Sequence, residues 1–75
     1  MTDLFATKSE QLLFWCRQRR MFNKAEVMKW GLENYYIRAD RSIRDFVNKG
    51  FIKRLNDRER ELLKITGKMA YYRVV

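Results

Sequence analysis

The sequence predicts an α+β fold that is mainly helical, in which three helices precede a C-terminal two-stranded β-hairpin. Three observations lead to this prediction: two helix-start signals, an amphipathic third segment, and a change from helical to alternating periodicity after Gly50. A chain of 75 residues buries barely enough surface to order one compact unit. We therefore expect a single domain over residues 1–75.

Two capping boxes indicate where the first two helices begin. Thr7 precedes Glu10 by three positions, and Asn23 stands in the same relation to Glu26. In such a box each side chain satisfies a free backbone N–H at the helix start. We therefore expect helices over about 8–20 and 24–33.

The apolar residues of these two helices fall on stripes that would face a core. Phe14 lies nearly opposite Leu12 and is expected to be exposed. Gly31 is a candidate helix stop, although the segment can also continue to Asn34. The residues expected to face inward are Leu12, Trp15, Cys16, Val27 and Trp30. In the turn that follows, Tyr35 and Tyr36 are expected first in the core, with base stacking or phosphate contact as alternatives.

Residues 38–49 carry the clearest helical pattern, and Gly50 is placed to cap their end. At about 100° per residue, Arg41 points away from the apolar face. No strong capping residue precedes Ala39. The apolar face comprises Ala39, Ile43, Phe46 and Val47. Around Arg41 lie Arg38, Asp45 and Asn48, with Ser42 and Arg44 at the margins.

Two strands are expected after Gly50, at about 51–55 and 69–75, because the apolar residues there alternate. Antiparallel pairing of the two would form a hairpin. The connection between them is predicted either as a short helical turn or as part of a strand.

The chain has 17 Lys and Arg against nine Asp and Glu, a formal net charge of +8. Such a charge favours polyanions, with nucleic acid first and an anionic membrane surface second; solubility is the plain alternative. The longest apolar run, Leu12 to Cys16, is too short to span a membrane, and the start MTDLFATKSE lacks the pattern of a secretory signal. We expect a cytoplasmic protein with no membrane partner.

Catalysis is not expected. The chain has one cysteine, Cys16, and no histidine, so it offers neither a disulfide nor a usual zinc site. It also lacks a Gly-rich phosphate loop and a partnered nucleophile. We expect no catalytic residues, metal, cofactor or small-molecule substrate.

The segment from Arg38 to Ile52 resembles the recognition helix and first wing strand of winged helix-turn-helix domains, in particular small ones from phages and mobile elements. The resemblance implies a double-stranded DNA-binding protein, such as a transcriptional regulator, with a homodimer as a possible assembly. It places the recognition helix in the major groove and the wing, about 56–68, on phosphates. The implied recognition-helix residues are Arg38, Arg41, Ser42, Arg44, Asp45 and Asn48. The implied wing residues are Arg54, Arg58, Arg60, Lys64 and Lys68.

Structural roles remain open for several of these residues. Arg41 and Asp45, or Asp40 and Arg44, are spaced to form ion pairs within the helix. The wing cations can equally belong to a solvated loop that contains Glu59 and Glu61. The alternative function is a protein-interaction module that uses Phe14, Tyr35 and Tyr36, with RNA binding as a third choice.

Overall fold

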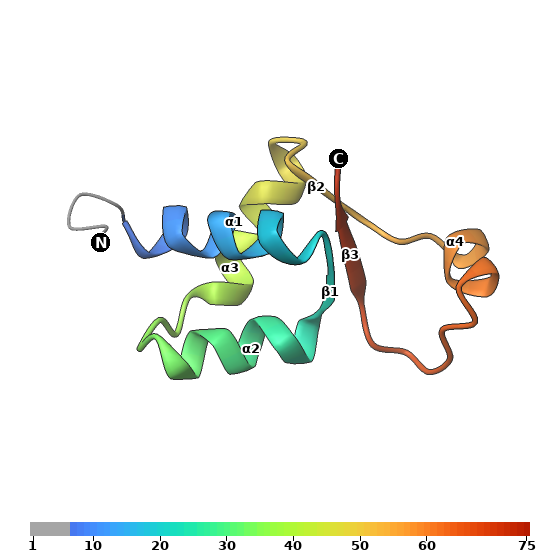
Figure 1. Ribbon diagram of the computed structural model, residues 1–75, viewed down its shortest axis with the longest axis horizontal. Helices are drawn as coiled ribbons and strands as arrows, with labels where there is room; N and C mark the ends of the chain where they lie inside the picture. Colours follow the sequence, from blue (N-terminus) through green and yellow to red (C-terminus); the bar gives the residue numbers. More distant parts are fainter. Residues whose placement is uncertain (1–6) are drawn as a thin grey trace.

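The computed structural model of the chain describes residues 7–75. The prediction that the start MTDLFATKSE is no secretory signal therefore falls mostly outside the described residues. The fold is α+β and mainly helical, as predicted. In Figure 1 the longer helices lie at one end of the molecule and a short helix lies at the other, joined by strands. In chain order the elements are α1 (Lys8–Arg19), β1 (Met21–Asn23), α2 (Lys24–Glu33), α3 (Ala39–Asn48), β2 (Ile52–Arg54), α4 (Asp57–Leu62) and β3 (Tyr71–Val74).

Both predicted capping boxes are present. The Thr7 hydroxyl accepts a hydrogen bond from the Glu10 N–H at 3.1 Å, and the Glu10 carboxylate accepts one from the Thr7 N–H at 2.9 Å. Asn23 and Glu26 make the same pair of bonds, at 2.9 and 3.0 Å. Helices α1 and α2 therefore begin where the sequence indicated.

The expected two-stranded hairpin is corrected to a three-stranded antiparallel sheet with the order β1-β3-β2. Strand β3 lies in the middle, where Tyr72 pairs with Phe22 of β1 and with Arg54 of β2. The three residues of β1 lie between two helices and pair with a strand about fifty positions away. Because their partner is so distant, the local sequence pattern gives no signal for this strand.

One apolar core lies between the three long helices and the sheet. In Figure 1, α3 passes behind α1, and α2 lies along the lower edge. Trp15 of α1 bridges to Phe22 of β1 and Trp30 of α2, with ring centroids 5.4 and 6.5 Å away. The buried apolar residues are Leu12, Cys16, Phe22, Val27, Trp30, Ala39, Ile43, Phe46 and Ile52, with Leu55 at the edge of the sheet.

Helix α2 does not stop at Gly31 but continues to Glu33. A Cβ atom on Gly31 would lie 2.7 Å from the Tyr36 carbonyl oxygen and 3.0 Å from the Ala39 Cβ. The glycine therefore permits close packing of α2 against the turn that leads into α3, and it does not terminate the helix.

The expectation that both turn tyrosines enter the core was wrong for Tyr35. Its side chain is 92% exposed, whereas Tyr36 is half-buried and packs edge-on against Trp30 with centroids 6.3 Å apart. Tyr35 has a left-handed φ of 55°, two positions after the last residue of α2, Glu33. Adjacent positions in this turn therefore have opposite environments.

Residues 54–70, which we call the arm, comprise the last residue of β2 and the connection from there to β3, and they contain α4. Figure 1 shows that the arm projects away from the three long helices. The segment left open by the sequence is therefore helical at 57–62. A third capping box, Asn56 with Glu59, starts α4 with bonds of 2.8 and 3.1 Å. The same spacing of residues that identified the first two boxes would have predicted it.

Candidate nucleic-acid interface

The outer face of α3 carries a group of exposed polar and cationic side chains. The buried positions of α3 recur at helical spacing, so its other positions point to solvent. Arg38 precedes the helix, and its side chain makes no cap, as the sequence indicated. The exposed residues on this face are Arg38, Arg41, Arg44, Asp45 and Asn48.

The arginines of this face are free of ion pairs within residues 7–75. The two ion pairs in this range join Arg19 to Glu26 and Arg73 to Glu59. Neither Arg41 with Asp45 nor Arg44 with Asp40 forms the pair that their spacing allowed. The Asp40 carboxylate instead accepts a hydrogen bond from the backbone N–H of Arg41 at 2.9 Å. The guanidinium groups of α3 are therefore available to an external anion.

Ser42 does not belong to this face, which corrects its predicted placement. Its side chain is buried, and its hydroxyl shares a 2.6 Å hydrogen bond with the hydroxyl of Tyr36. Such a bond satisfies a polar group that would otherwise be buried without a partner. Ser42 therefore helps to fix the turn before α3 and is not presented to a ligand.

The end of α3 is fixed by a Schellman motif. The N–H of Phe51 donates to the Phe46 carbonyl at 2.9 Å, and the N–H of Gly50 donates to the Val47 carbonyl at 3.0 Å. Gly50 has a φ of 79°, a region that glycine adopts without steric cost. The rings of Phe46 and Phe51 lie 6.3 Å apart and supply the apolar contact that accompanies such motifs. The helix thus passes directly into β2.

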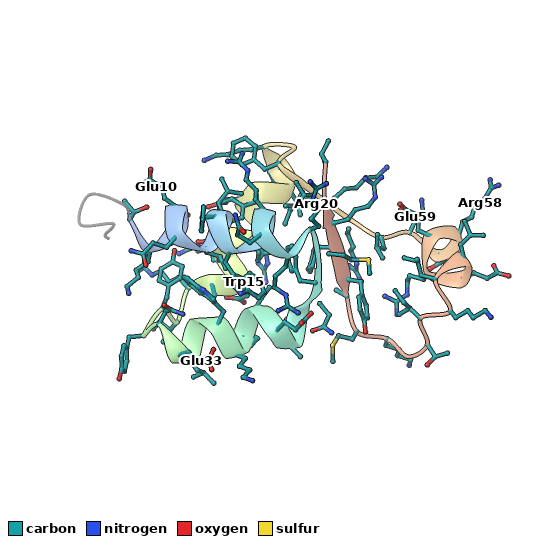
Figure 2. The ribbon with its side chains drawn as sticks, viewed as in Figure 1. Glu10, Trp15, Arg20, Glu33, Arg58 and Glu59 are labelled. Atoms are coloured by element: carbon teal, nitrogen blue, oxygen red, sulfur yellow. The ribbon has the colours of Figure 1, made fainter. Side chains whose placement is uncertain are left out.

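Most of the predicted cations of the arm are exposed, but Arg60 is engaged within it. Its guanidinium donates to the carbonyl oxygens of Met69 and Gly67 at 2.6 and 2.8 Å and lies 5.5 Å from the ring centroid of Tyr71. Figure 2 shows Arg58 at the far end of the arm. The exposed cations are Arg54, Arg58, Lys64 and Lys68.

Glu59 explains why an acidic residue stands among the cations of the arm. It completes the capping box of α4, and its other carboxylate oxygen accepts from Nε of Arg73 at 2.8 Å. The Asn56 backbone N–H and then Arg73 hold the pKa of Glu59 below its ordinary value. Glu59 therefore ties α4 to β3, and its negative charge is paired with Arg73.

A hollow of about 320 Å³ lies where the two ends of the arm meet. Three cations from separate segments line it, Arg54, Arg60 and Lys68, together with the carboxylate of Asp57. The fold thus brings together basic residues that are up to 14 positions apart (54 to 68) in the sequence. With the Arg60 guanidinium held by the Met69 and Gly67 carbonyls, Arg54 and Lys68 are the lining cations left to attract a phosphate group.

The arginines at the end of α1 are partly occupied by contacts with the fold. Arg17 lies over the ring of Phe51 at 5.9 Å, and Arg19 lies over Trp15 at 5.3 Å in addition to its ion pair with Glu26. Arg20 is exposed and ends the helix with a φ of 69°. Of the three, Arg20 has the side chain least committed to an aromatic ring.

Three residues were named for the protein-interaction alternative, and they differ in exposure. Phe14 is 65% exposed on α1, and Tyr35 is exposed at the end of α2. Tyr36 is instead half-buried and bonded to Ser42. Phe14 and Tyr35 can contact a partner, whereas Tyr36 serves the fold.

Among residues 7–75 no group of three or more His, Cys, Asp and Glu is placed to hold a metal ion. Cys16 is fully buried, and burial raises the pKa of its thiol to about 12. The helices of the described part are too short or too polar to cross a membrane. No protein-family model, curated protein or solved structure matches the chain.

Proposed function

We propose that the chain is a winged helix-turn-helix protein that binds double-stranded DNA and has no catalytic activity of its own. Three helices followed by the antiparallel pair β2 and β3 agree with the winged-helix plan. Regulation of transcription, or another DNA-binding role in a phage or mobile element, is the setting that the sequence resemblance implies.

The observation that carries the proposal is the outer face of α3. It presents Arg38, Arg41 and Arg44 to solvent without ion pairs in the described chain, on the side opposite the buried Ile43. Arginine can form two hydrogen bonds with guanine in the major groove, and asparagine, here Asn48, can do so with adenine. An α-helix fits that groove, so the whole face can engage base edges at once.

The arm supplies the second contact in this proposal. Its exposed cations, together with the hollow lined by Arg54 and Lys68, would bind phosphates beside the groove that α3 enters. Phosphate contacts of this kind position a protein without reading sequence. Discrimination between sequences is therefore assigned to α3 and general affinity to both regions.

The test is a titration of the full chain with a random-sequence duplex at a series of salt concentrations. Log affinity should fall linearly with log salt, with a slope of several units. Arg41→Ala should reduce that slope by about one and weaken binding at a fixed low salt by roughly three- to tenfold. Arg41→Lys should keep the slope, because the charge remains, and lose part of any preference for a selected sequence.

Lys8→Ala is the matched control, since it removes one exposed cation from the start of α1. It should change the slope by much less than Arg41→Ala does. Equal losses from the two variants would mean that net charge alone attracts DNA, which contradicts a defined α3 interface. Absence of duplex binding at low salt would reject the proposal and favour the protein-interaction alternative.

A further inference from the structure

Helix α2 has apolar side chains on two sides, of which the fold covers one. Val27 and Trp30 point into the core and are buried. Ala25, Met28 and Leu32 follow at helical spacing on the other side and are exposed, Leu32 to 75%. A helix that is apolar on both sides is typical of a position between two packing partners. In Figure 1, α2 forms the lower edge of the helical end of the molecule.

The exposed stripe continues into the turn before α3. Tyr35 and Ile37 are 92% and 89% exposed, and neither adds to the core. A small cavity of about 100 Å³ lies between this turn and α2, lined in part by Met28, Leu32 and Ile37. We call the exposed residues Ala25, Met28, Leu32, Tyr35 and Ile37 the α2 patch.

The backbone of Tyr35 fixes how this residue joins the patch. The N–H of Tyr36 donates to the Gly31 carbonyl at 2.7 Å, which makes Tyr35 the left-handed residue of a Schellman motif with a φ of 55°. Glycine is favoured there, and another residue in that conformation costs about 1 kcal/mol. This turn holds the Tyr35 side chain out from the fold, 92% exposed, beside the exposed apolar residues of α2.

The charged residues beside the patch favour a second copy of the chain as its binding partner. With a formal charge of +8, two copies of the chain repel each other over most of their surface. Beside the α2 patch, however, Lys29 and Glu33 are both exposed, and neither forms an ion pair within residues 7–75. Figure 2 shows Glu33 on the outer side of α2. One flank of α2 therefore carries one cation and one anion at a spacing of four residues, which a second, antiparallel copy of the same helix can complement.

We propose that the α2 patch is the docking surface for a second copy of this chain, with the two α2 helices antiparallel across a two-fold axis. A two-fold interface uses the same patch on both subunits. In an antiparallel pair, residues on the same flank meet, so Lys29 lies opposite the partner's Glu33, and the same pair forms again across the axis. The outer face of α3 does not take part, so the inference stands independently of DNA binding.

The first experiment is sedimentation velocity on the full chain from about 1 µM to 1 mM, without DNA. We expect a reversible monomer–dimer equilibrium with a dissociation constant of roughly 10–100 µM, because one short helix and a turn form a small interface. Leu32→Glu should weaken it at least tenfold. The matched control is Leu62→Glu on α4, where the leucine is 74% exposed, and it should have little effect.

The second experiment tests the orientation of the helices. Lys29→Glu and Glu33→Lys should each weaken the dimer severalfold, and the double variant should restore it because both cross-pairs are rebuilt. Lys29→Glu lowers the net charge, so general repulsion alone would predict a tighter dimer. A wild-type chain that stays monomeric at about 1 mM, an equal effect of Leu62→Glu and Leu32→Glu, or a double variant that is not restored would each overturn the proposal.

Discussion

The helical part of the molecule and the arm carry similar cationic residues but use them differently. On α3 the buried residues Ile43 and Phe46 attach the helix to the core, and the arginines of its outer face make no ion pair within residues 7–75. Helix α4 has no buried residue. In the arm, Arg60 binds two carbonyl groups, and Arg73 of the adjacent strand pairs with Glu59.

The difference follows from the apolar core. Burial of large apolar side chains stabilises a helix by several kcal/mol, so its polar face is free for other contacts. Helix α4 buries no such side chain, so it depends on hydrogen bonds and charge pairs, each of which contributes about 1 kcal/mol. Charged residues in the arm therefore have to be divided between holding the arm and binding a ligand. A count of cations alone would assign all of them to the ligand.

The largest expected effect concerns the packing that positions α3. Gly31→Ala should destabilise the protein by about 2–3 kcal/mol, because the added Cβ would lie 2.7 Å from the Tyr36 carbonyl oxygen, a backbone atom. In an unconstrained helix the same change stabilises by about 1 kcal/mol, so the predicted sign opposes helix propensity. Urea denaturation at low protein concentration measures it.

Leu32→Ala is the control for this prediction, since it changes an exposed position on the same helix. Its effect on the free energy of unfolding should stay below about 0.5 kcal/mol. If Gly31→Ala proved neutral or stabilising, the close approach of α2 and the following turn would not set the orientation of α3.

The next effect tests the division of cations within the arm. Arg60→Ala removes two hydrogen bonds and the contact with Tyr71, so it should lower the local stability of the arm by about 1–2 kcal/mol. Arg58→Ala removes the same charge from an exposed site and should change it by less than about 0.5 kcal/mol. Hydrogen exchange of the backbone N–H groups of Leu63, Lys64 and Ile65 reports on this region.

Duplex binding should separate the two variants in a second way. Arg58→Ala should reduce the salt slope by up to one unit without loosening the arm, whereas Arg60→Ala should weaken binding because the arm becomes less ordered. Equal exchange rates in both variants would show that Arg60 does not hold the arm and that the contrast with α3 is unfounded.

The sequence predicted the helices well because their signals are local. The capping boxes at Thr7 and Asn23 and the apolar spacing of α3 located the three helices to within about one residue at each end. It missed β1, because pairing with a distant strand leaves no local trace. Burial of Ser42 was also missed, since its bond to Tyr36 depends on how the turn folds. Solvent exposure at a helix margin is decided by such neighbours.

For the candidate site, the sequence correctly placed five polar residues on the outer side of α3, because helical geometry alone decides which residues lie opposite the core. It could not separate Arg60 from Arg58 in the arm. Both are arginines of a short polar helix, and only the return of the chain through Gly67 and Met69 gives one of them carbonyl partners.

The smallest expected effect is a pH dependence that should appear in the arm. The pKa of Glu59 is lowered, first by the Asn56 N–H and then by Arg73, so the charged carboxylate favours the folded arm. Its contribution is complete above the ordinary value of 4.5 and is lost as pH falls below that value through the lowered pKa. Amide chemical shifts of α4 should therefore move in this acidic range.

Glu59→Gln separates this titration from general acid effects. Glutamine can complete a capping box but carries no charge, so the shifts of α4 should lose most of their pH dependence while the helix remains. Glu10, whose pKa is also lowered by its capping box with Thr7, should still titrate at the start of α1 in that variant. If α4 kept the wild-type acid response in Glu59→Gln, the carboxylate would not be what couples the arm to β3, and the free and engaged charges of the molecule would have to be reassigned.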